Sequence, residues 1–528
     1  MADRSGLRRV CLGALAAALA VVAMPAAASA AERYVVLYKN EATPVSVGTS
    51  VQRAGGTLVA DYAQIGVVIA SSDDAAFASK MRNQAGVEQV AATGGFGIRP
   101  FKDDAADDGA SGPPPGGLPN SPATDADTFS PLQWDMQQIR TPQAHAITGG
   151  SPSVTVGDID TGLDKDHPDL VQNIDFSRSV SCQSGAPVSS PAAWDDHNGH
   201  GTHTAGTIAA AANGMGIVGV APNVKVAGIK SSNDDGFFFP EMVICSFMWA
   251  GSQHLDVTNN SYFADPFLYN CRNDPVQHAI WKAEQRAIRY AQNQGVTVVA
   301  AAGNESDDLS HPGLDVTSPD FPPGSEQQRE VTNACVVVPV EIPGVVGVSA
   351  NGRMVQQDRD DDDDYLKSFF SSYGTSAVDV VAPGGDSLFP EPSVRGRVLS
   401  TWPADAMANC LASRQVVESG VPGGTYCWQQ GTSMASPHAA GVAALIVSRF
   451  GDSSSPQNGK MRPGQVASIL SQTANPQPCP ETLPAGYEDF TQTSGEPQEC
   501  QGGPGHNSWY GNGRVDALSA ITHASGNG

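Results

Sequence analysis

Positive charge is scarce in this sequence, and long apolar runs are absent beyond its first residues. The 528-residue chain has 30 Lys and Arg against 55 Asp and Glu, which gives a formal net charge of −25. Because proteins that bind nucleic acid present basic faces, this balance argues against nucleic acid as a partner. No segment after the N-terminal one is apolar over the length of a membrane-spanning helix, so we expect no stable membrane association.

Two metal-binding patterns and internal repeats are missing as well. No two cysteines are separated by two residues, which argues against a structural zinc site, and the HExxH motif of zinc proteases is absent. We find no internal repeat. The length and the 40% hydrophobic fraction are instead typical of a globular protein with a large core and more than one domain.

The N-terminal segment has the three parts of a secretory signal peptide. Arg4, Arg8 and Arg9 supply positive charge, residues 11–24 are apolar, and residues 28–30 read Ala-Ser-Ala, a small-residue cleavage site. The sequence therefore predicts a signal peptide over residues 1–30 and a secreted protein. The adjacent arginines leave twin-arginine export open, although general secretion is the simpler interpretation.

The cysteines also indicate an exported protein. One of the nine, Cys11, lies in the predicted signal peptide, and the remaining eight form an even number, which predicts disulfide bonds. Cys410 with Cys427, and Cys479 with Cys500, would each close a short local loop. The pairing of the other four cysteines is not set by the sequence.

The rest of the chain divides into three parts. Residues 32–100 combine strand-like and helical patterns and predict a small domain. Residues 101–130 are acidic and rich in Pro and Gly, which predicts a flexible, exposed linker. Residues 131–525 alternate apolar strand-like runs with helical patterns.

The strands of this third part predict its fold class. Strands that are apolar throughout and separated by helices favour an α/β fold, with a mostly parallel, doubly wound sheet covered by helices on both faces. The clearest strand-like segments are VTVGDID, VKVAGIK, VTVVAAAGN, VVGVSA and AVDVVAPGG.

Two of the polar motifs in this part contain candidate catalytic groups. Asp158 and Asp160 lie in a strand that ends at DIDTG, and catalytic groups gather at such strand ends, although a helix cap or turn would also explain them. In DDHNGHGTHTAG, His197, His200 and His203 recur every three residues and could hold a metal. The flanking glycines weaken a helical ligand face, so one histidine acting as a general base is favoured.

A third motif, GTSMASPHAAG, places Ser433 among very small residues. The run that follows is apolar all round, which predicts a buried helix, and Pro437 fits near its start. Ser433 would then lie at a helix N-terminus, where backbone N–H groups favour a negative oxygen. A turn or surface serine is the alternative, unless a base and an orienting carboxylate lie nearby.

The order of Asp160, His200 and Ser433 in these motifs resembles the subtilisin family of serine proteases (subtilases) over residues 131–525. The resemblance implies that Ser433 is the nucleophile, His200 its base and then the acid for the leaving amine, and Asp160 the group that orients the imidazole. Asn304 in AAGNES matches the side-chain oxyanion donor. The resemblance also implies an endopeptidase that forms an acyl-enzyme and needs no cofactor for catalysis.

The same resemblance assigns residues to a cleft for polypeptide substrates. Ser261, Tyr262 and Phe263 occupy one edge to which an extended peptide would add as a strand, and Gly236 lies near the other. Gly303, beside the oxyanion donor, belongs to the same cleft. Phe263 stands where the family has glycine, so we expect a narrowed primary pocket or a displaced edge.

The resemblance also implies a structural calcium ion, an inhibitory domain and a monomer. Asp169 and Asn213 match the positions that supply oxygen ligands to calcium in family members. Residues 32–100 look like an α+β, ferredoxin-like propeptide of the inhibitor I9 type. Such a propeptide assists folding and blocks the cleft of the zymogen until it is cut off, here within residues 100–130.

Two other interpretations remain for the sequence. A catalytically silent binding protein could keep the fold, although the presence of Asp160, His200, Asn304 and Ser433 counts against it. A metal-dependent hydrolase could instead use the histidine cluster.

Overall fold

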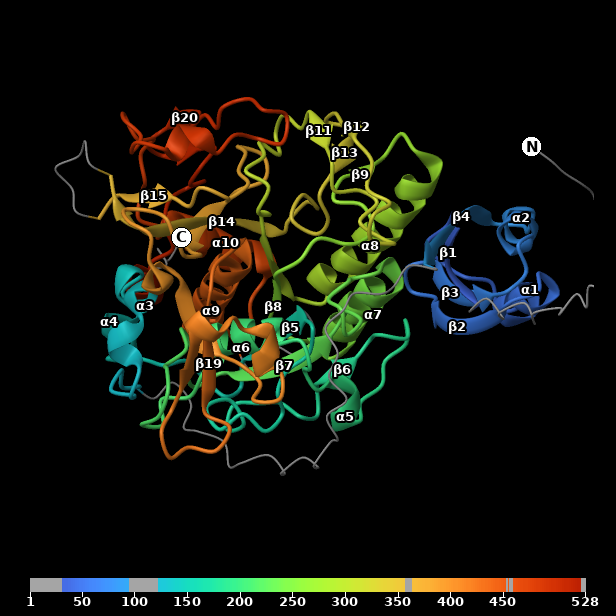
Figure 1. The fold of residues 1–528 in the computed structure, drawn as a ribbon. Coiled ribbons are helices and arrows are strands. Elements are labelled where there is room, and N and C mark those ends of the chain that lie inside the picture. Colours follow the sequence, from blue (N-terminus) through green and yellow to red (C-terminus); the bar gives the residue numbers. More distant parts are fainter. Residues whose placement is uncertain (1–30, 95–121, 357–362, 453, 455–458, 524–528) are drawn as a thin grey trace, which may run out of the picture. The chain divides into compact units, whose positions relative to one another are not determined.

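The structure is a computed structural model that describes residues 31–94, 122–356, 363–452, 454 and 459–523 (Figure 1). The predicted signal peptide, and residues 101–121 of the predicted linker, lie outside the described residues. Within the described ranges, no helix combines the length and apolarity needed to cross a membrane.

The small N-terminal unit is a four-stranded antiparallel sheet in the order β2-β3-β1-β4 with two helices. This βαββαβ order is the ferredoxin-like arrangement that the sequence predicts. A short helix, α1, was not foreseen. The elements are β1 (Glu32–Tyr38), α1 (Val47–Arg53), β2 (Thr57–Tyr62), β3 (Val67–Ser72), α2 (Phe77–Arg82) and β4 (Val87–Gly94).

The large sheet confirms the predicted α/β fold. Its order is β15-β14-β10-β8-β5-β7-β6, with β16 also paired to β14, and every pair is parallel except β14 with β15. The strands are β5 (Thr155–Asp160), β6 (Val180–Ser181), β7 (Lys225–Lys230), β8 (Val257–Asn260), β10 (Thr297–Ala301), β14 (Val346–Val355), β15 (Tyr365–Lys367) and β16 (Val380–Pro383).

Helices cover both faces of this sheet (Figure 1). Val156 and Val226 pack with α9 in one core, whereas Ile159 and Ile229 point to the other face and pack with α7 and α8. Alternate residues of one strand thus enter two separate cores. The helices are α6 (His200–Ala209), α7 (Pro240–Ser252), α8 (Pro275–Asn293), α9 (Thr432–Phe450), α10 (Pro463–Gln472) and α11 (Ala517–Thr522).

Shorter elements lie around this framework. A three-stranded antiparallel sheet, β17-β19-β18, packs beside α6. The short elements are α3 (Trp134–Gln138), α4 (Thr141–His145), α5 (Pro191–Trp194), β9 (Asn270–Cys271), β11 (Leu314–Asp315), β12 (Arg329–Glu330), β13 (Cys335–Val336), β17 (Val398–Thr401), β18 (Gln415–Val417), β19 (Thr425–Gln429), β20 (Gly502–Gly503) and β21 (His506–Asn507).

Four disulfide bonds stabilise the large domain. The two predicted local pairs, Cys410–Cys427 and Cys479–Cys500, are confirmed. The pairs that the sequence left open are Cys182–Cys245 and Cys271–Cys335, which join residues 63 and 64 positions apart. All eight cysteines that follow the predicted signal peptide are therefore bonded.

Residues 122–130 differ from the exposed linker that their composition predicts. The buried Asp127 carboxylate accepts the backbone N–H groups of Asn213 and Gly214, both at 3.0 Å. Two bonds from further neighbours fix the rest of this strap: Thr128 Oγ1 donates to Glu418, and the Phe129 N–H donates to the Gly216 carbonyl. Because a short polar segment can be ordered by the hydrogen bonds of a distant loop, composition alone misjudged it.

The small unit packs on α7 and α8 through one face of its sheet. In β1, Val35 and Leu37 join the core that contains α7, whereas Val36 on the other face joins the small unit's own core. The Arg286 guanidinium in α8 donates to the Tyr38 carbonyl at 2.8 Å. The two faces of β1 therefore pack in two different hydrophobic cores.

Candidate active site

Three neighbouring parallel strands bring polar groups to one edge of the large sheet. Ile159 in β5 pairs with Asn260 in β8, and Asn260 pairs with Ala300 in β10, so the carboxyl ends of these strands lie side by side. Asp160 ends β5, and polar residues follow the other two strands. Catalytic groups gather at this edge in open α/β sheets.

Helix α9 brings Ser433 to the same edge. Its apolar residues are buried on all sides, which fixes the helix in the core and sets Ser433 in its first turn. Ser433 Oγ donates to the Ser261 carbonyl at 3.1 Å, and Ser261 Oγ donates back to the Ser433 carbonyl at 3.0 Å. These two bonds hold the helix start against the segment after β8.

His200, the first residue of α6, is bonded to Asp160 as predicted. Its Nδ1 lies 2.7 Å from Asp160 Oδ1, and the Asp160 side chain is fully buried. Burial lowers the pKa of His200, but the charge and hydrogen bond of Asp160 outweigh it, so this pKa lies above its usual 6.5. The arrangement favours the imidazolium that a general base becomes when it takes a proton.

Ser433 and His200 line one cleft without being hydrogen-bonded to each other. Ser433 Oγ uses its proton on the Ser261 carbonyl instead. In serine hydrolases without substrate, the nucleophile–base bond is often long and tightens only in the complex. A small rotation of the Ser433 side chain is the movement that the chemistry requires.

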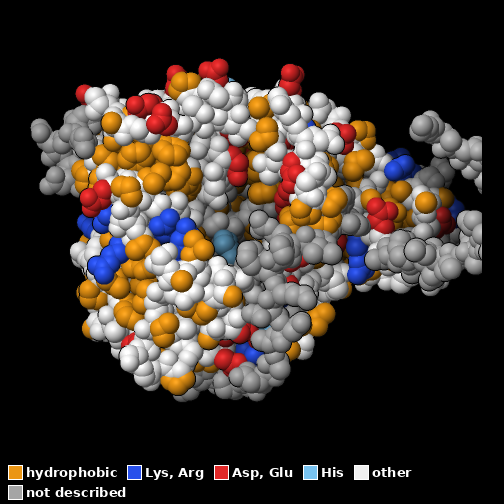
Figure 2. All heavy atoms as spheres, viewed as in Figure 1, with side chains coloured by type: hydrophobic (Ala, Val, Ile, Leu, Met, Phe, Trp, Pro, Cys, Tyr) orange, Lys and Arg blue, Asp and Glu red, His pale blue; other side chains and the backbone are white. Residues whose placement is uncertain are grey.

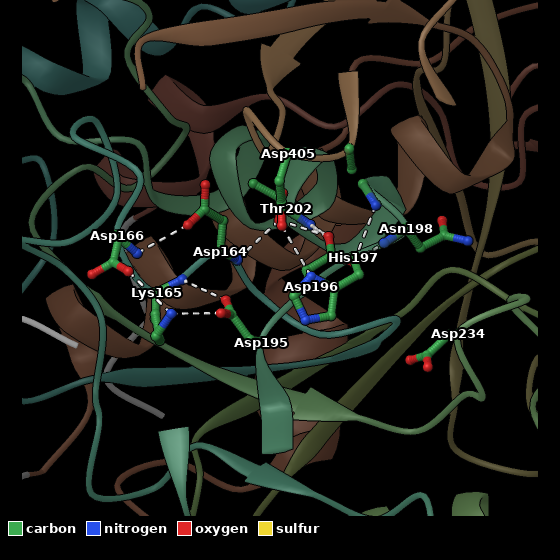
Figure 3. A network of polar contacts seen from close by, with 12 residues as sticks. Asp164, Lys165, Asp166, Asp195, Asp196, His197, Asn198, Thr202, Asp234 and Asp405 are labelled. Atoms are coloured by element: carbon green, nitrogen blue, oxygen red, sulfur yellow. Dashed lines mark hydrogen bonds and ion pairs between the residues drawn. The ribbon is translucent and has the colours of Figure 1, made fainter. Parts of the chain in front are cut away.

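The loop before His200 is held by a carboxylate that the sequence analysis did not single out. Asp196 accepts the Thr202 N–H at 3.0 Å near the start of α6, and its other oxygen accepts Thr161 Oγ1 at 2.9 Å (Figure 3). It therefore joins the residue after Asp160 to the helix that carries His200. A carboxylate shortly before a helix is the sequence signal that could have revealed it.

The other two histidines of the cluster bind elsewhere. His197 Nδ1 lies 3.0 Å from Asp405, as Figure 3 shows, and the buried His203 Nε2 lies 3.0 Å from the Cys427 carbonyl. Burial lowers the pKa of His203 to about 3, which keeps it neutral. Because the three rings have separate partners, they do not converge on one ion, and among the described residues no group of three His, Cys, Asp or Glu does so.

Two further polar residues near Asp160 and Ser433 are hydrogen-bonded within the fold. Asp158 accepts Thr204 Oγ1 at 2.8 Å and Asn259 Nδ2 at 2.9 Å. Burial and the charge of Asp160 raise the pKa of Asp158 well above its ordinary value. His438 is buried in α9, where its ring bonds the Met434 carbonyl and lies 3.0 Å from a carboxylate of α3.

Asn304 lies beside Ser433 with its amide oriented by the same helix start. Its Oδ1 accepts the Thr432 N–H at 2.9 Å, which leaves the Nδ2 donors directed away from that bond. Gly303 has φ of +111°, where a side chain would be strained, and an added Cβ would lie 2.6 Å from Glu305. The turn therefore needs glycine to present Asn304 at the cleft.

The main cleft has a volume of about 510 Å³ and contains all the predicted substrate residues. Tyr262 stacks on Phe238 with ring centroids 4.2 Å apart, so the two predicted edges meet at their aromatic side chains. Phe263 is half-buried and lines the cleft. Figure 2 shows a hollow that holds a histidine, with acidic side chains above it in this view. The predicted substrate residues that line this cleft are Gly236, Ser261, Tyr262, Phe263 and Gly303.

A second cavity, of about 340 Å³, adjoins the main cleft. Asn198, His200, Asn304 and Ser433 line both cavities. The wall of the second one comes from the segment of the Cys410–Cys427 disulfide, which the sequence analysis did not connect with the site. Its additional lining residues are Trp402, Asn409, Gln429, Gln430 and Met434.

Comparison with protein families decides the relationship of this chain. Residues 151–513, more than half of the sequence, match the model of the subtilase family. The chain is a subtilase. This confirms the family that the motifs around Asp160, His200 and Ser433 predict.

Known relatives of this subtilase are moderately similar. Fervidolysin of Fervidobacterium pennivorans is 28% identical over 366 residues, which cover 67% of this chain and 42% of fervidolysin. Subtilisin NAT of Bacillus subtilis subsp. natto is 29% identical over 318 residues, or 60% of this chain and 61% of that protein. The matches thus span less than two thirds of these relatives.

Solved structures show the same fold. The epidermin leader peptide processing serine protease of Staphylococcus aureus has a TM-score of 0.64 at 21% identity, covering 94% of this subtilase and 99% of that chain. The crystal structure of fervidolysin has a TM-score of 0.60 at 24% identity, covering 95% of this subtilase and 62% of that chain.

The residues predicted to bind calcium in this subtilase do not fit the ion. Asp169 accepts the Ile217 N–H at 3.0 Å, Tyr426 OH at 3.2 Å and Asn213 Nδ2 at 3.2 Å. Calcium requires a shell of oxygen ligands, but here N–H and O–H donors surround the carboxylate, and further N–H groups of the same loop point at Asp127. The expected calcium ion therefore finds no support, and nothing below depends on it.

Proposed function

We propose that this chain is a secreted serine endopeptidase that hydrolyses polypeptides through an acyl-enzyme. The observation that carries this proposal is the 2.7 Å bond between His200 and Asp160 in a cleft that also contains Ser433 and Asn304. A positioned base, an orienting carboxylate and a serine at a helix start are the groups that acyl transfer requires.

In this mechanism Ser433 Oγ attacks the carbonyl carbon of the scissile bond while His200 Nε2 takes the hydroxyl proton. The carbonyl oxygen becomes an oxyanion, which the Asn304 amide and the Ser433 N–H stabilise. Collapse of the tetrahedral intermediate breaks the C–N bond, and His200 gives its proton to the leaving amine. A water molecule then repeats the sequence to release the acid.

We assign the larger cavity to the residues before the scissile bond and the smaller one to those after it. The larger cavity lies between the two segments that contain Gly236 and Ser261, and such exposed edges can pair with an extended peptide. Phe263 and the neighbouring Tyr262 then shape the primary pocket.

Residues 32–100 are assigned the role of an inhibitory propeptide and folding aid in an autoprocessed zymogen. Two observations support this assignment. The small unit packs on α7 and α8, and Thr93 in its last strand lies near the buried Glu241 at the start of α7, which follows the cleft-lining Phe237 and Phe238 in the chain. Export by residues 1–30 and a monomeric mature enzyme belong to the same proposal.

The test is to label the exported protein with a serine-directed phosphonate and analyse it by mass spectrometry. We expect the label on Ser433 and a mature N-terminus downstream of residue 94. Inhibition by a chelator with no phosphonate labelling would favour a metal-dependent hydrolase. A properly folded protein that is neither labelled nor active on casein would favour a silent scaffold.

A further inference from the structure

The larger cavity is lined by acidic residues and by no basic ones. Neither Lys nor Arg lines it among the described residues, and His200 is its one histidine. Five carboxylates belong to its lining: Asp235, Asp265, Glu305, Asp320 and Glu326. A cleft of one sign concentrates ligands of the other, so the acidic lining indicates a cationic substrate.

Two of these carboxylates form a pair, in which Asp265 is buried and Asp320 is half-buried. Asp265 and Asp320 are hydrogen-bonded to each other, although they lie in different loops of the chain. Asp265 is only 4% exposed and also accepts the Phe238 N–H, which anchors it to the cleft edge. Asp320 Oδ1 is buried and has no hydrogen-bond partner among the described residues. Asp320 thus has an oxygen to which the described residues donate no hydrogen bond.

No cation of the described residues neutralises this pair. No Lys or Arg of the described residues forms an ion pair with Asp265 or Asp320, and Arg329 is paired with Asp315 instead. Buried carboxylates without a counter-charge are costly unless they are protonated or paired. A cation brought by the substrate would remove that cost and form charge-assisted hydrogen bonds.

Aromatic rings next to the pair suit the stem of a long basic side chain. Tyr262 and Phe238, stacked in parallel, line the same cavity, and Phe263 lies beside them. Lys and Arg pack their methylene groups along apolar surfaces and place the charged head on a polar one. The cavity thus offers both an apolar wall and an anionic end.

The position of the pair along the substrate follows from the chain. Ser261 is hydrogen-bonded to Ser433, and Asp265 follows Ser261 by four residues. The Cα atoms of Ser261 and Asp265 can therefore be at most about 14 Å apart. An extended peptide advances about 3.3 Å per residue. The pair can therefore face a substrate residue no more than about four positions from the scissile bond.

We propose that the cleft selects polypeptides with an Arg or Lys three or four residues before the scissile bond, and that Asp265 and Asp320 bind this side chain. The inference rests on the proposed function, because it assigns a substrate class to the same cleft. It makes Asp265 and Asp320 specificity-determining residues, separate from the triad.

The charges around the pair agree with this assignment. Burial is the largest cause that raises the pKa of Asp265 and of Asp320. The hydrogen bond between them raises the pKa of Asp265 further. Glu284 adds negative charge beside Asp265, and Glu326 and Asp315 beside Asp320. A bound guanidinium would displace the proton that the pair holds, so the preference for Arg should grow as the pH rises.

The experiment compares internally quenched peptides that differ only by Arg or citrulline at one of the five residues before the bond or the three after it. Citrulline keeps the shape of Arg but has no charge. With the mature enzyme we expect kcat/KM for Arg to exceed that for citrulline by about tenfold at the third or fourth position before the bond. Asp320→Asn should reduce this ratio to below about threefold.

The matched control is Glu330→Gln, which removes an exposed carboxylate of the same loop region that does not line the cavity. It should keep the full Arg preference. Equal losses in both variants would overturn the assignment to the pair, because long-range charge would then explain the preference.

The comparison of Arg and citrulline peptides on the wild-type enzyme tests the inference even if Asp320→Asn fails to fold. Equal cleavage of Arg and citrulline peptides at all positions, or a preference only after the bond, would overturn the inference and leave the protease function intact. If folded wild type cuts no peptide and Ser433 takes no phosphonate label, both the inference and the proposed function are wrong.

Discussion

The two cavities that meet at Ser433 have opposite chemistry. The larger one is bordered by carboxylates and aromatic rings, whereas the smaller one has carboxamides, Trp402 and Met434, with no carboxylate, Lys or Arg among its described lining residues. Both contain His200, Asn304 and Ser433. One catalytic centre therefore serves two differently built binding surfaces.

This difference indicates how binding is divided across the scissile bond. Carboxylates distinguish cations from neutral side chains, so the larger cavity can select. Carboxamides both donate and accept hydrogen bonds, so the smaller cavity can bind a peptide backbone with little regard for side-chain charge. Substitution of a residue that lines both cavities should reduce cleavage of every substrate. Substitution of a residue that lines one cavity should affect only the substrate residues on that side of the scissile bond.

The largest effect is expected for a shared residue. Ser433→Ala should lower kcat by roughly six orders of magnitude, as for the subtilisin triad, because no other group can form the acyl-enzyme. The variant should also remain uncut between the small unit and residue 122. Casein hydrolysis and intact mass measure these outcomes, and a purified variant that still hydrolyses casein would refute the role of Ser433.

Asn304→Ala should have the next largest effect. Loss of a side-chain oxyanion donor costs about 10²–10³ in kcat in subtilisin. Because Asn304 acts on the oxyanion, the loss should appear in kcat with little change in KM, and equally for Arg and citrulline peptides. A loss confined to KM would show that Asn304 binds ground-state substrate instead.

A residue of the smaller cavity should affect only the residues after the bond. Trp402 packs over Gly199, where an added Cβ would lie 2.2 Å from its ring, and it also lines that cavity. Trp402→Ala should weaken acyl transfer to added peptide amides by about three- to tenfold, which is within the range for loss of an aromatic contact.

The control for Trp402→Ala is the Arg preference before the bond. This preference should be unchanged, because Trp402 does not line the larger cavity. A variant that loses Arg selectivity together with acyl transfer would mean that the two surfaces are not separable.

The smallest effect is a pH dependence confined to the acidic cavity. Burial, helped by the Asp307 charge, raises the pKa of Glu305 to about 7 in the folded protein, against 4.5 ordinarily. The folded state thus retains a proton that the unfolded state loses, so this contribution to stability is complete below pH 4.5 and disappears as the pH rises through 7.

Glu305→Gln, introduced into the inactive Ser433→Ala protein, should flatten the fall of the unfolding free energy between pH 5 and 7. The expected change in slope is up to about 1.4 kcal/mol per pH unit. Urea unfolding at several pH values measures it. Glu330→Gln is the control, because that side chain is exposed and should leave the slope unchanged.

The proposed catalytic residues could be located from the sequence because each lies in a short motif beside a regular element. Asp160 ends an apolar strand, His200 starts a helix and Ser433 starts another, so local patterns fix their types and parallel strands bring them together. The two local disulfides were predictable for a similar reason, since their loops are short.

The substrate carboxylates were not predictable in this way. Asp265 and Asp320 lie 55 residues apart in irregular segments, and only the folded loops make them neighbours. The calcium expectation finds no support for a related reason. Residue types at Asp169 and Asn213 match a ligand set, but the direction of the backbone N–H groups depends on the conformation of the loop.

The strap of residues 122–130 restricts where a productive maturation cut can fall. Asp125 lies 3.0 Å from the buried His145 ring, and Asp127 closes the loop at Asn213. Trimming past these two acids would leave His145 and that loop with unmatched donors in the interior. The finished enzyme should therefore begin upstream of Asp125, and both acids should stay part of the mature chain.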